Sequence, residues 1–292
     1  MQFLAAVAAY PFLQNALLAG MLAGIACGVM GSYVVVRRIT YIAGAIAHCV
    51  LAGLGAARYL QVVHGWPIHP GQGAVVAAVI SALIIGMVSL RAREREDTVI
   101  GAVWAIGMAI GILFIAVTPG YHEDLMSYLF GNILLIGRAA LWMMAALDAV
   151  VVALGLGLYP QLEAVSFDEE FARLRGIRVE LYVLVLLILV ALTVVLLVSV
   201  VGVVLVIALL TLPAAIAGQF TTTLRGMMAV GSLLAVGFTT AGLALSYAPD
   251  LPAGATTIVL AGIAYLAVLA SHVSLATTVP VFAIDSIRRL YE

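Results

Sequence analysis

The sequence contains no lysine, and all 13 of its basic residues are arginine. A phosphate-binding loop of the form GxxxxGK[ST] requires a lysine, and so does an enzyme that forms a Schiff base with its substrate. The chain therefore cannot bind ATP through such a loop, and it cannot form such an adduct.

Charge and cysteine are scarce as well. Only 9% of the 292 residues are charged, whereas 65% are hydrophobic. The two cysteines, Cys27 and Cys49, lie inside apolar runs without a pairing pattern, so no disulfide framework is expected and both are interpreted as core residues. The apolar runs are too long and too numerous for one soluble domain, which predicts an all-α polytopic membrane protein.

The start MQFLAAVAAY has no basic residue, so no cleaved signal peptide is expected.

The apolar runs predict about nine transmembrane helices, at about 20 residues for each crossing of the bilayer. Between 180 and 220 only Gly202 marks a break, and Pro213 is expected to end the second segment early, so one of these two segments is predicted to be short or half-inserted. The predicted spans are 12–36, 40–61, 73–90, 98–118, 138–159, 180–200, 203–220, 227–247 and 255–278.

The arginines predict the orientation of these spans. Cytoplasmic loops of membrane proteins are enriched in basic residues. With the N-terminus outside and the C-terminus cytoplasmic, every arginine except Arg58 and Arg138 falls on the cytoplasmic side.

The first span carries Gly20, Gly24 and Gly28 at intervals of four residues. This spacing places three small residues on one helical face and predicts close packing against another helix. The alternative is that glycine is simply common in membrane helices.

The segment YPQLEAVSFDEEFARLRGIRVE is typical of a short helix at the membrane surface. Ser166 and Glu169 have the spacing of a capping box, which predicts that Ser166 is the N-cap. Gly176 is expected to end the helix in the left-handed conformation. Phe171 and Leu174 share a face, which either rests on lipid headgroups or projects toward a partner.

Two ionisable side chains lie near the middle of predicted spans, and such residues are functional candidates because they are costly in hydrocarbon. His48 lies roughly 12 Å from the cytoplasmic end of its span at 1.5 Å per residue. Its neutral imidazole could bind a transition-metal ion, or it could be a hydrogen-bonded packing residue. Asp148 could supply a carboxylate ligand, or it could pair with a buried donor of the scaffold.

The predicted outer loops hold further candidates that could collect a cation near the mouth of a pathway or contact a docked partner. No spacing among them predicts a closed zinc site. These residues are His64, His69, His122, Glu123 and Asp124.

Six segments, in this order along nearly the whole chain, resemble the permease subunits of zinc, manganese and iron ABC importers, the ABC-3 family. They are GVMGSYVVVRRITYIAGAIAHCVLAG (28–53), EDTVIGAVWAIGM (96–108), DLMSYLFGNIL (124–134), SFDEEFARLRGI (166–177), VVGVVLVIALLTLPAAIA (200–217) and LSYAPDLPAGATTIVLAG (245–262).

The resemblance implies that residues 1–292 form a single transmembrane permease domain, related in fold to the vitamin B12 and siderophore permeases. It implies a multi-pass protein of the cell inner membrane that works as a homodimer with a cytoplasmic ATPase dimer and an extracytoplasmic metal-binding protein, and without nucleic acid. The chain is then not itself an enzyme, and it holds no stable cofactor, because zinc, or else manganese or iron, is its cargo. A coupling helix near 166–176 would contact the ATPase through Glu169, Phe171, Leu174 and Gly176.

The sequence departs from the family at one position. Many members carry an aspartate four residues before the histidine that corresponds to His48, whereas this chain has Gly44. The expected metal-ligand set is therefore reduced to His48, with Asp148 as a candidate from another helix.

Three other functions were weighed against the importer. An ion-coupled secondary transporter would use His48 and Asp148 as a proton relay, and an inverted repeat would support it. A vitamin or siderophore permease would be expected to have one more span. A membrane metalloprotease would need an HExxH motif, which the sequence does not contain.

Overall fold

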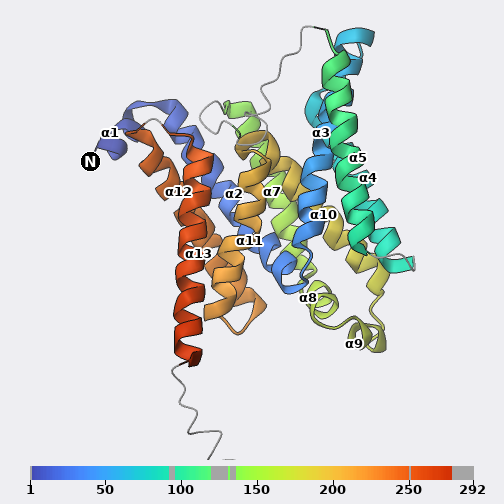
Figure 1. The fold of residues 1–292 in the computed structure, drawn as a ribbon, viewed down its shortest axis with the longest axis vertical. Coiled ribbons are helices and arrows are strands. Elements are labelled where there is room, and N and C mark those ends of the chain that lie inside the picture. Colours follow the sequence, from blue (N-terminus) through green and yellow to red (C-terminus); the bar gives the residue numbers. More distant parts are fainter. Residues whose placement is uncertain (1, 92–95, 120–130, 132–135, 250, 278–292) are drawn as a thin grey trace, which may run out of the picture.

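A computed structural model describes residues 2–91, 96–119, 131, 136–249 and 251–277 of the chain. Within these residues all regular structure is helical (Figure 1). In chain order the helices are α1 (Gln2–Ala9), α2 (Pro11–Val36), α3 (Thr40–His64), α4 (Pro70–Arg91), α5 (Glu96–Val117), α7 (Arg138–Gly157), α8 (Tyr159–Phe167), α9 (Glu169–Leu174), α10 (Val179–Val201), α11 (Val203–Phe220), α12 (Leu224–Tyr247) and α13 (Ala253–Thr277).

Nine of the described helices are long and apolar enough to cross a membrane. This number confirms the prediction, and the helix bounds agree with the predicted spans to within a few residues. The sequence reading did not predict α1, which is separated from α2 only by Tyr10. Pro11 then occupies the first turn of α2, where its missing N–H group costs no hydrogen bond.

The break between α10 and α11 lies at Gly202, whose φ of 80° is readily adopted only by glycine. The expectation that the second segment ends early at Pro213 was wrong, because α11 continues through Pro213 to Phe220. A proline removes one helical hydrogen bond, and neighbouring helices in a membrane bundle can compensate for this loss. With 18 residues, α11 is roughly 27 Å long and nearly matches a hydrocarbon core of about 30 Å.

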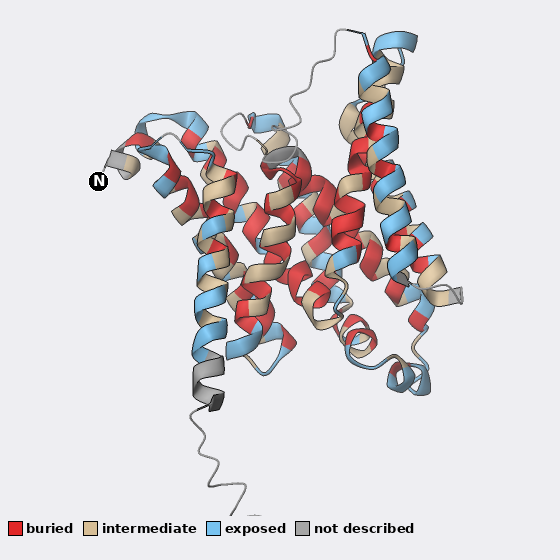
Figure 2. Cartoon of the chain, viewed as in Figure 1, coloured by how far each residue is buried: buried red, intermediate tan, exposed pale blue. Residues whose placement is uncertain are grey.

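Helix α2 forms the centre of the bundle. It packs against α12, α11 and α7, and it has the largest buried share of the nine apolar helices. Figure 2 shows that buried residues gather in the middle of the molecule, whereas α5 and α13 are largely exposed along their length. These outer helices therefore have apolar faces that are available to lipid or to another chain.

The predicted glycine face of α2 lies against α12. A Cβ atom at Gly24 would lie 2.7 Å from the backbone nitrogen of Val236, and one at Gly28 would overlap the backbone nitrogen of Ser232. The hydroxyl of Thr239 donates a hydrogen bond to the carbonyl oxygen of Gly20 over 3.3 Å. The two backbones can approach this closely only because these positions have no side chain.

The segment after α7 forms two helices instead of the single short one that was predicted. Ser166 lies inside α8, where its hydroxyl donates to the carbonyl oxygen of Leu162 over 2.6 Å, so its prediction as an N-cap was wrong. Asp168 is the N-cap of α9 in its place, and its carboxylate accepts a hydrogen bond from the backbone N–H of Phe171 over 3.0 Å. A free carboxylate is as good a cap as a serine hydroxyl, and it also favours the positive end of the helix.

Helix α9 ends as predicted at Gly176, which has a φ of 76°. The N–H of Gly176 donates to the carbonyl of Arg173 over 2.9 Å, and that of Ile177 donates to the carbonyl of Ala172 over 3.0 Å. This pair of bonds is the Schellman arrangement, which satisfies carbonyl groups that the helix end leaves free.

The packing of α2 on α12 predicts that Gly28→Ala lowers the free energy of unfolding by about 1–3 kcal/mol, because the added methyl group forces the two backbones apart. Unfolding of the purified protein in detergent, followed by circular dichroism, measures this change. Gly237→Ala on α12 is the matched control, since a Cβ there meets nothing within 4 Å. Equal stability of the two variants would contradict the proposed importance of this contact.

Candidate ion pathway and coupling segment

His48 lies in α3 and is half-buried, with its imidazole ring stacked on the indole of Trp104 from α5. The ring centroids are 4.5 Å apart and the planes differ by 15°. The indole covers one face of the imidazole and so fixes the plane of the ring. The two nitrogens lie on the ring edge, which stacking leaves available to a ligand. The sequence reading missed Trp104, although it lies in one of the six motifs.

Glycines bring α3 and α5 close enough for this stack. A Cβ atom at Gly111 would lie 2.6 Å from Cγ of Leu51, and one at Gly107 would overlap the sulfur of Cys49. Cys49 is buried, and its thiol donates to the carbonyl oxygen of Val103 over 3.0 Å. Cys49 thus belongs to the contact between the helices, as predicted for a core residue.

Gly44 lies one helical turn before His48 and is buried. A Cβ atom there would be 3.8 Å from both Trp104 and Ile207, which is ordinary van der Waals contact. A Cβ atom is therefore tolerated at this position, and a longer side chain would have to pack between Trp104 and Ile207.

A cavity of about 340 Å³ lies beside the stack, with Trp104 in its wall. Tyr41 contributes to it from α3, and Asp97 and Gly101 from α5. Tyr41 and His48 are seven residues apart, as are Asp97 and Trp104, so each pair lies on one face of its helix. The cavity therefore extends from Trp104 toward the end of the bundle where α3 and α5 begin, and His48 is not among the residues that line it. The sequence reading named neither Tyr41 nor Asp97.

Asp148 lies on α7 and is only 4% exposed. Neither of its carboxylate oxygens has a hydrogen-bond partner among the described residues. Gly155, two helical turns further along the same face of α7, is nearest Val29 and Met30 of α2, so Asp148 faces α2. His48 faces α5, so the two candidate ligands lie in different helix interfaces. Among the residues that the structure describes, no three His, Cys, Asp or Glu side chains are grouped to hold a metal ion.

Of the predicted outer residues, the structure describes two. His64 is the last residue of α3, where its ring meets Tyr59 edge-on at 5.8 Å. His69 is exposed, and its Nδ1 accepts a hydrogen bond from the N–H of Gly71 over 3.2 Å. His122, Glu123 and Asp124 lie outside the described residues.

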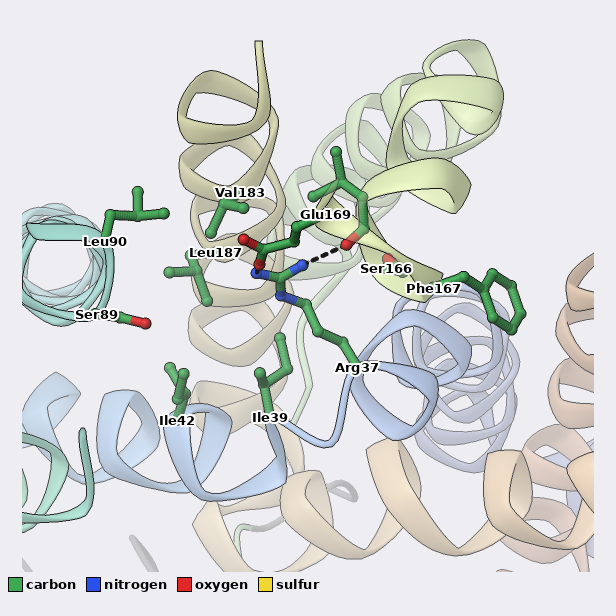
Figure 3. Close-up of a pocket in the computed structure, with 11 residues that line it drawn as sticks. Arg37, Ile39, Ile42, Ser89, Leu90, Ser166, Phe167, Glu169, Val183 and Leu187 are labelled. Carbon is green, nitrogen blue, oxygen red and sulfur yellow. Dashed lines mark hydrogen bonds and ion pairs between the residues drawn. The ribbon is translucent and has the colours of Figure 1, made fainter. Parts of the chain in front are cut away.

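Helices α8 and α9 present an apolar surface that no part of the described chain covers. Phe167, Phe171 and Leu174 are 64%, 51% and 88% exposed. Figure 3 shows that the ring of Phe167 is turned away from the Arg37–Glu169 ion pair, although Phe167 contributes to the wall of the same pocket. Three large apolar side chains on so short a segment are typical of a contact site or a membrane surface.

Glu169 points toward the end of α2. Its carboxylate forms an ion pair with the guanidinium of Arg37 at the end of α2, with an N to O distance of 2.5 Å (Figure 3). Near the start of α12, Arg225 lies over the ring of Tyr159 from α8, 4.4 Å from its centroid. The segments that hold these arginines therefore meet at one end of the bundle.

Comparisons with known proteins agree with this architecture. The model of the ABC 3 transport family matches residues 9–272. The chain is 39% identical over 255 residues to a Chlamydia muridarum membrane protein named for a metal transport system, with 87% of each chain covered. It is 33% identical over 258 residues to the manganese transport system membrane protein MntC of Halalkalibacterium halodurans, covering 86% of this chain and 84% of the relative.

Solved structures share the fold. PsaBC from Streptococcus pneumoniae in complex with Fab contains a chain that superposes with a TM-score of 0.81 at 29% identity, covering 91% of this chain and 94% of that one. An inward-facing metal-chelate type ABC transporter superposes with a TM-score of 0.66 at 16% identity, which shows the fold alone. Because the family model covers most of its length, the chain belongs to the ABC 3 transport family.

Proposed function

We propose that this chain is the membrane-spanning permease of an ATP-driven importer for divalent transition-metal ions. The observation that carries the proposal is the His48–Trp104 stack, which offers an imidazole beside a cavity leading to one end of the bundle. Imidazole is a common ligand of such ions. A separate subunit hydrolyses ATP, because the chain has no lysine for a phosphate-binding loop.

The proposed importer contains two copies of the chain, a cytoplasmic ATPase dimer and an extracytoplasmic metal-binding protein. The end that carries α9 faces the cytoplasm, which agrees with the arginines at that end. The N-terminus is then outside and the C-terminus cytoplasmic. The exposed surface of Phe167, Phe171 and Leu174 seats in the ATPase.

In the proposed transport cycle, the binding protein releases an ion into an outward-open space between the two permease chains. His48 of each chain offers a transient site, and ATP-driven movement of α9 opens the inner side. The ion then passes along the cavity, where the carboxylate of Asp97 and the hydroxyl of Tyr41 receive it. Few ligands are an advantage here, because an ion held too tightly would not leave.

Two observations bear on which metal is the cargo. An imidazole without a neighbouring carboxylate suits zinc or iron better than manganese, which prefers oxygen ligands. The relative MntC, by contrast, is named for manganese. We therefore propose zinc and manganese as the ions to be tested first, with iron next.

The arrangement gives no support to a proton relay between His48 and Asp148, since the two residues lie in different helix interfaces. A secondary transporter based on this pair is not favoured.

His48→Ala is predicted to abolish metal uptake, because it removes the imidazole that is stacked on Trp104, while expression and assembly remain normal. Uptake of zinc and manganese is measured in cells that lack other importers. Cys49→Ser is the control, since the thiol packs on α5 and is not a ligand. A His48→Ala variant that accumulates both metals at the normal rate would show that the histidine only packs against Trp104.

Gly44→Asp is predicted to tighten the binding of zinc or manganese to the purified permease by about tenfold, which corresponds to roughly 1.4 kcal/mol. The reason is that the new carboxylate would lie one helical turn from the imidazole, at a position where a Cβ atom makes only ordinary van der Waals contacts. Calorimetric titration measures the Kd, and Gly44→Asn is the control of equal size without charge. Equal affinities for the two variants would exclude a ligand at this position.

Replacing both Phe171 and Leu174 by alanine is predicted to weaken binding of the ATPase by roughly 2 kcal/mol, or about thirtyfold. The loss of apolar contact area is the cause, since the cap at Asp168 and the turn at Gly176 remain. Co-purification at graded ATPase concentrations measures the change. Leu233→Ala, at a 73% exposed leucine on α12, is the control. Undiminished ATPase binding would identify α9 as a helix that lies on the headgroups.

A further inference from the structure

The side chain of Arg37 joins three segments of the chain. Arg37 caps the C-terminus of α2, and its guanidinium donates to the carbonyl oxygen of Val165 near the end of α8 over 2.6 Å. It also pairs with Glu169, the first residue of α9. The side chain of Arg37 is 13% exposed and that of Glu169 is 40% exposed, so water and salt screen this ion pair only in part.

The connection from Arg37 to α3 is short and tightly bonded. The N–H of Arg38 donates to the carbonyl of Val35 over 3.1 Å, and that of Ile39 donates to the carbonyl of Val34 over 3.0 Å. Arg38 has a φ of 61°, a left-handed conformation that is strained for any residue except glycine. Helix α3 begins directly afterwards at Thr40. A displacement of Arg37 is therefore expected to move the start of α3 as well, because the turn between them is short and rigid.

Packing around the pair leaves room for movement. A cavity of about 380 Å³ lies beside it, walled by Ser89 and Leu90 of α4 and by Val183 and Leu187 of α10 (Figure 3). The second ion pair of α9 joins Arg173 to Glu180 of α10 over 3.1 Å, and both side chains are 54% exposed. This second pair faces solvent and does not reach α3.

We propose that the Arg37–Glu169 ion pair is the mechanical link that transmits movement of α9 to α3, the helix that carries His48. This inference rests on the proposed function for its role in transport. Arg37 and Glu169 then act as positioning residues, through α3 and His48. When the ATPase moves α9, the pair carries Arg37 with it, and the short turn at Arg38 shifts the start of α3.

A double-mutant cycle tests this link in vesicles that contain the permease, its ATPase and its binding protein. Arg37→Gln, Glu169→Gln and the double variant are compared for metal imported per ATP hydrolysed, with zinc and manganese as the ions. Each single variant is expected to lower this ratio roughly two- to thirtyfold, the range in which single residues modulate coupling. The double variant is expected to be no worse than the more impaired single one, because both substitutions break the same interaction.

Glu180→Gln is the matched control, since it breaks the exposed ion pair of the same helix. It is expected to leave the ratio unchanged. An equal loss in Glu180→Gln would overturn the proposal, because it would show that any charge lost near α9 has this effect. Single-variant losses that multiply in the double variant would overturn it as well.

A second measurement uses the permease alone and does not depend on transport. Spin labels are attached at Glu170 of α9 and at Tyr41 of α3, both exposed, after the two native cysteines have been replaced. The unmodified pair is expected to give one narrow distance distribution, and Arg37→Gln is expected to broaden it. An unchanged distribution would exclude the link. If the wild-type vesicles import no metal, the proposed function fails, and the label distances still decide whether Arg37 joins the two helices.

Discussion

The interior of a bilayer offers no water to a polar group, and this constraint determines most of the structure. Each spanning segment satisfies its backbone as a helix, and small residues allow close contact between helices, with some polar side chains bonded across them. The glycines of α2 against α12, and those of α5 against α3, are the clearest cases. Ionisable side chains at membrane depth are exceptional in such a protein, and His48, stacked on Trp104, is one of them.

The spans were predictable from the sequence because each one is a run of nearly continuous apolar residues, and Gly202 marked the one break that lacks a polar loop. For other features, the local sequence is compatible with more than one structure. The hydroxyl of Ser166 can cap a following helix or bond back to its own, and burial within α8 selects the second. Pro213 was expected to end α11, but a membrane bundle tolerates an internal proline.

The site was only partly predictable for a related reason. His48 is conspicuous in its own segment, whereas its stacking partner belongs to another helix and is one aromatic residue among many. The partners Arg37 and Glu169 are 132 residues apart in the sequence, and neither segment contains a local pattern that predicts their ion pair. Asp148 was as conspicuous as His48, but the packing of α7 on α2 places it in a different interface. Local sequence identifies unusual residues, and only the tertiary arrangement decides which of them meet.

The site at His48 and the coupling surface at α9 lie at different depths of the same bundle, and the α2–α3 turn connects them. The account as a whole depends on the chain being the permease of a metal importer. The most direct test is to reconstitute the wild-type permease with its ATPase and binding protein in vesicles and to follow zinc or manganese with an indicator enclosed inside. The account predicts metal accumulation that requires both ATP and the binding protein. Accumulation driven by a proton gradient without ATP, or none with any divalent transition metal, would contradict it.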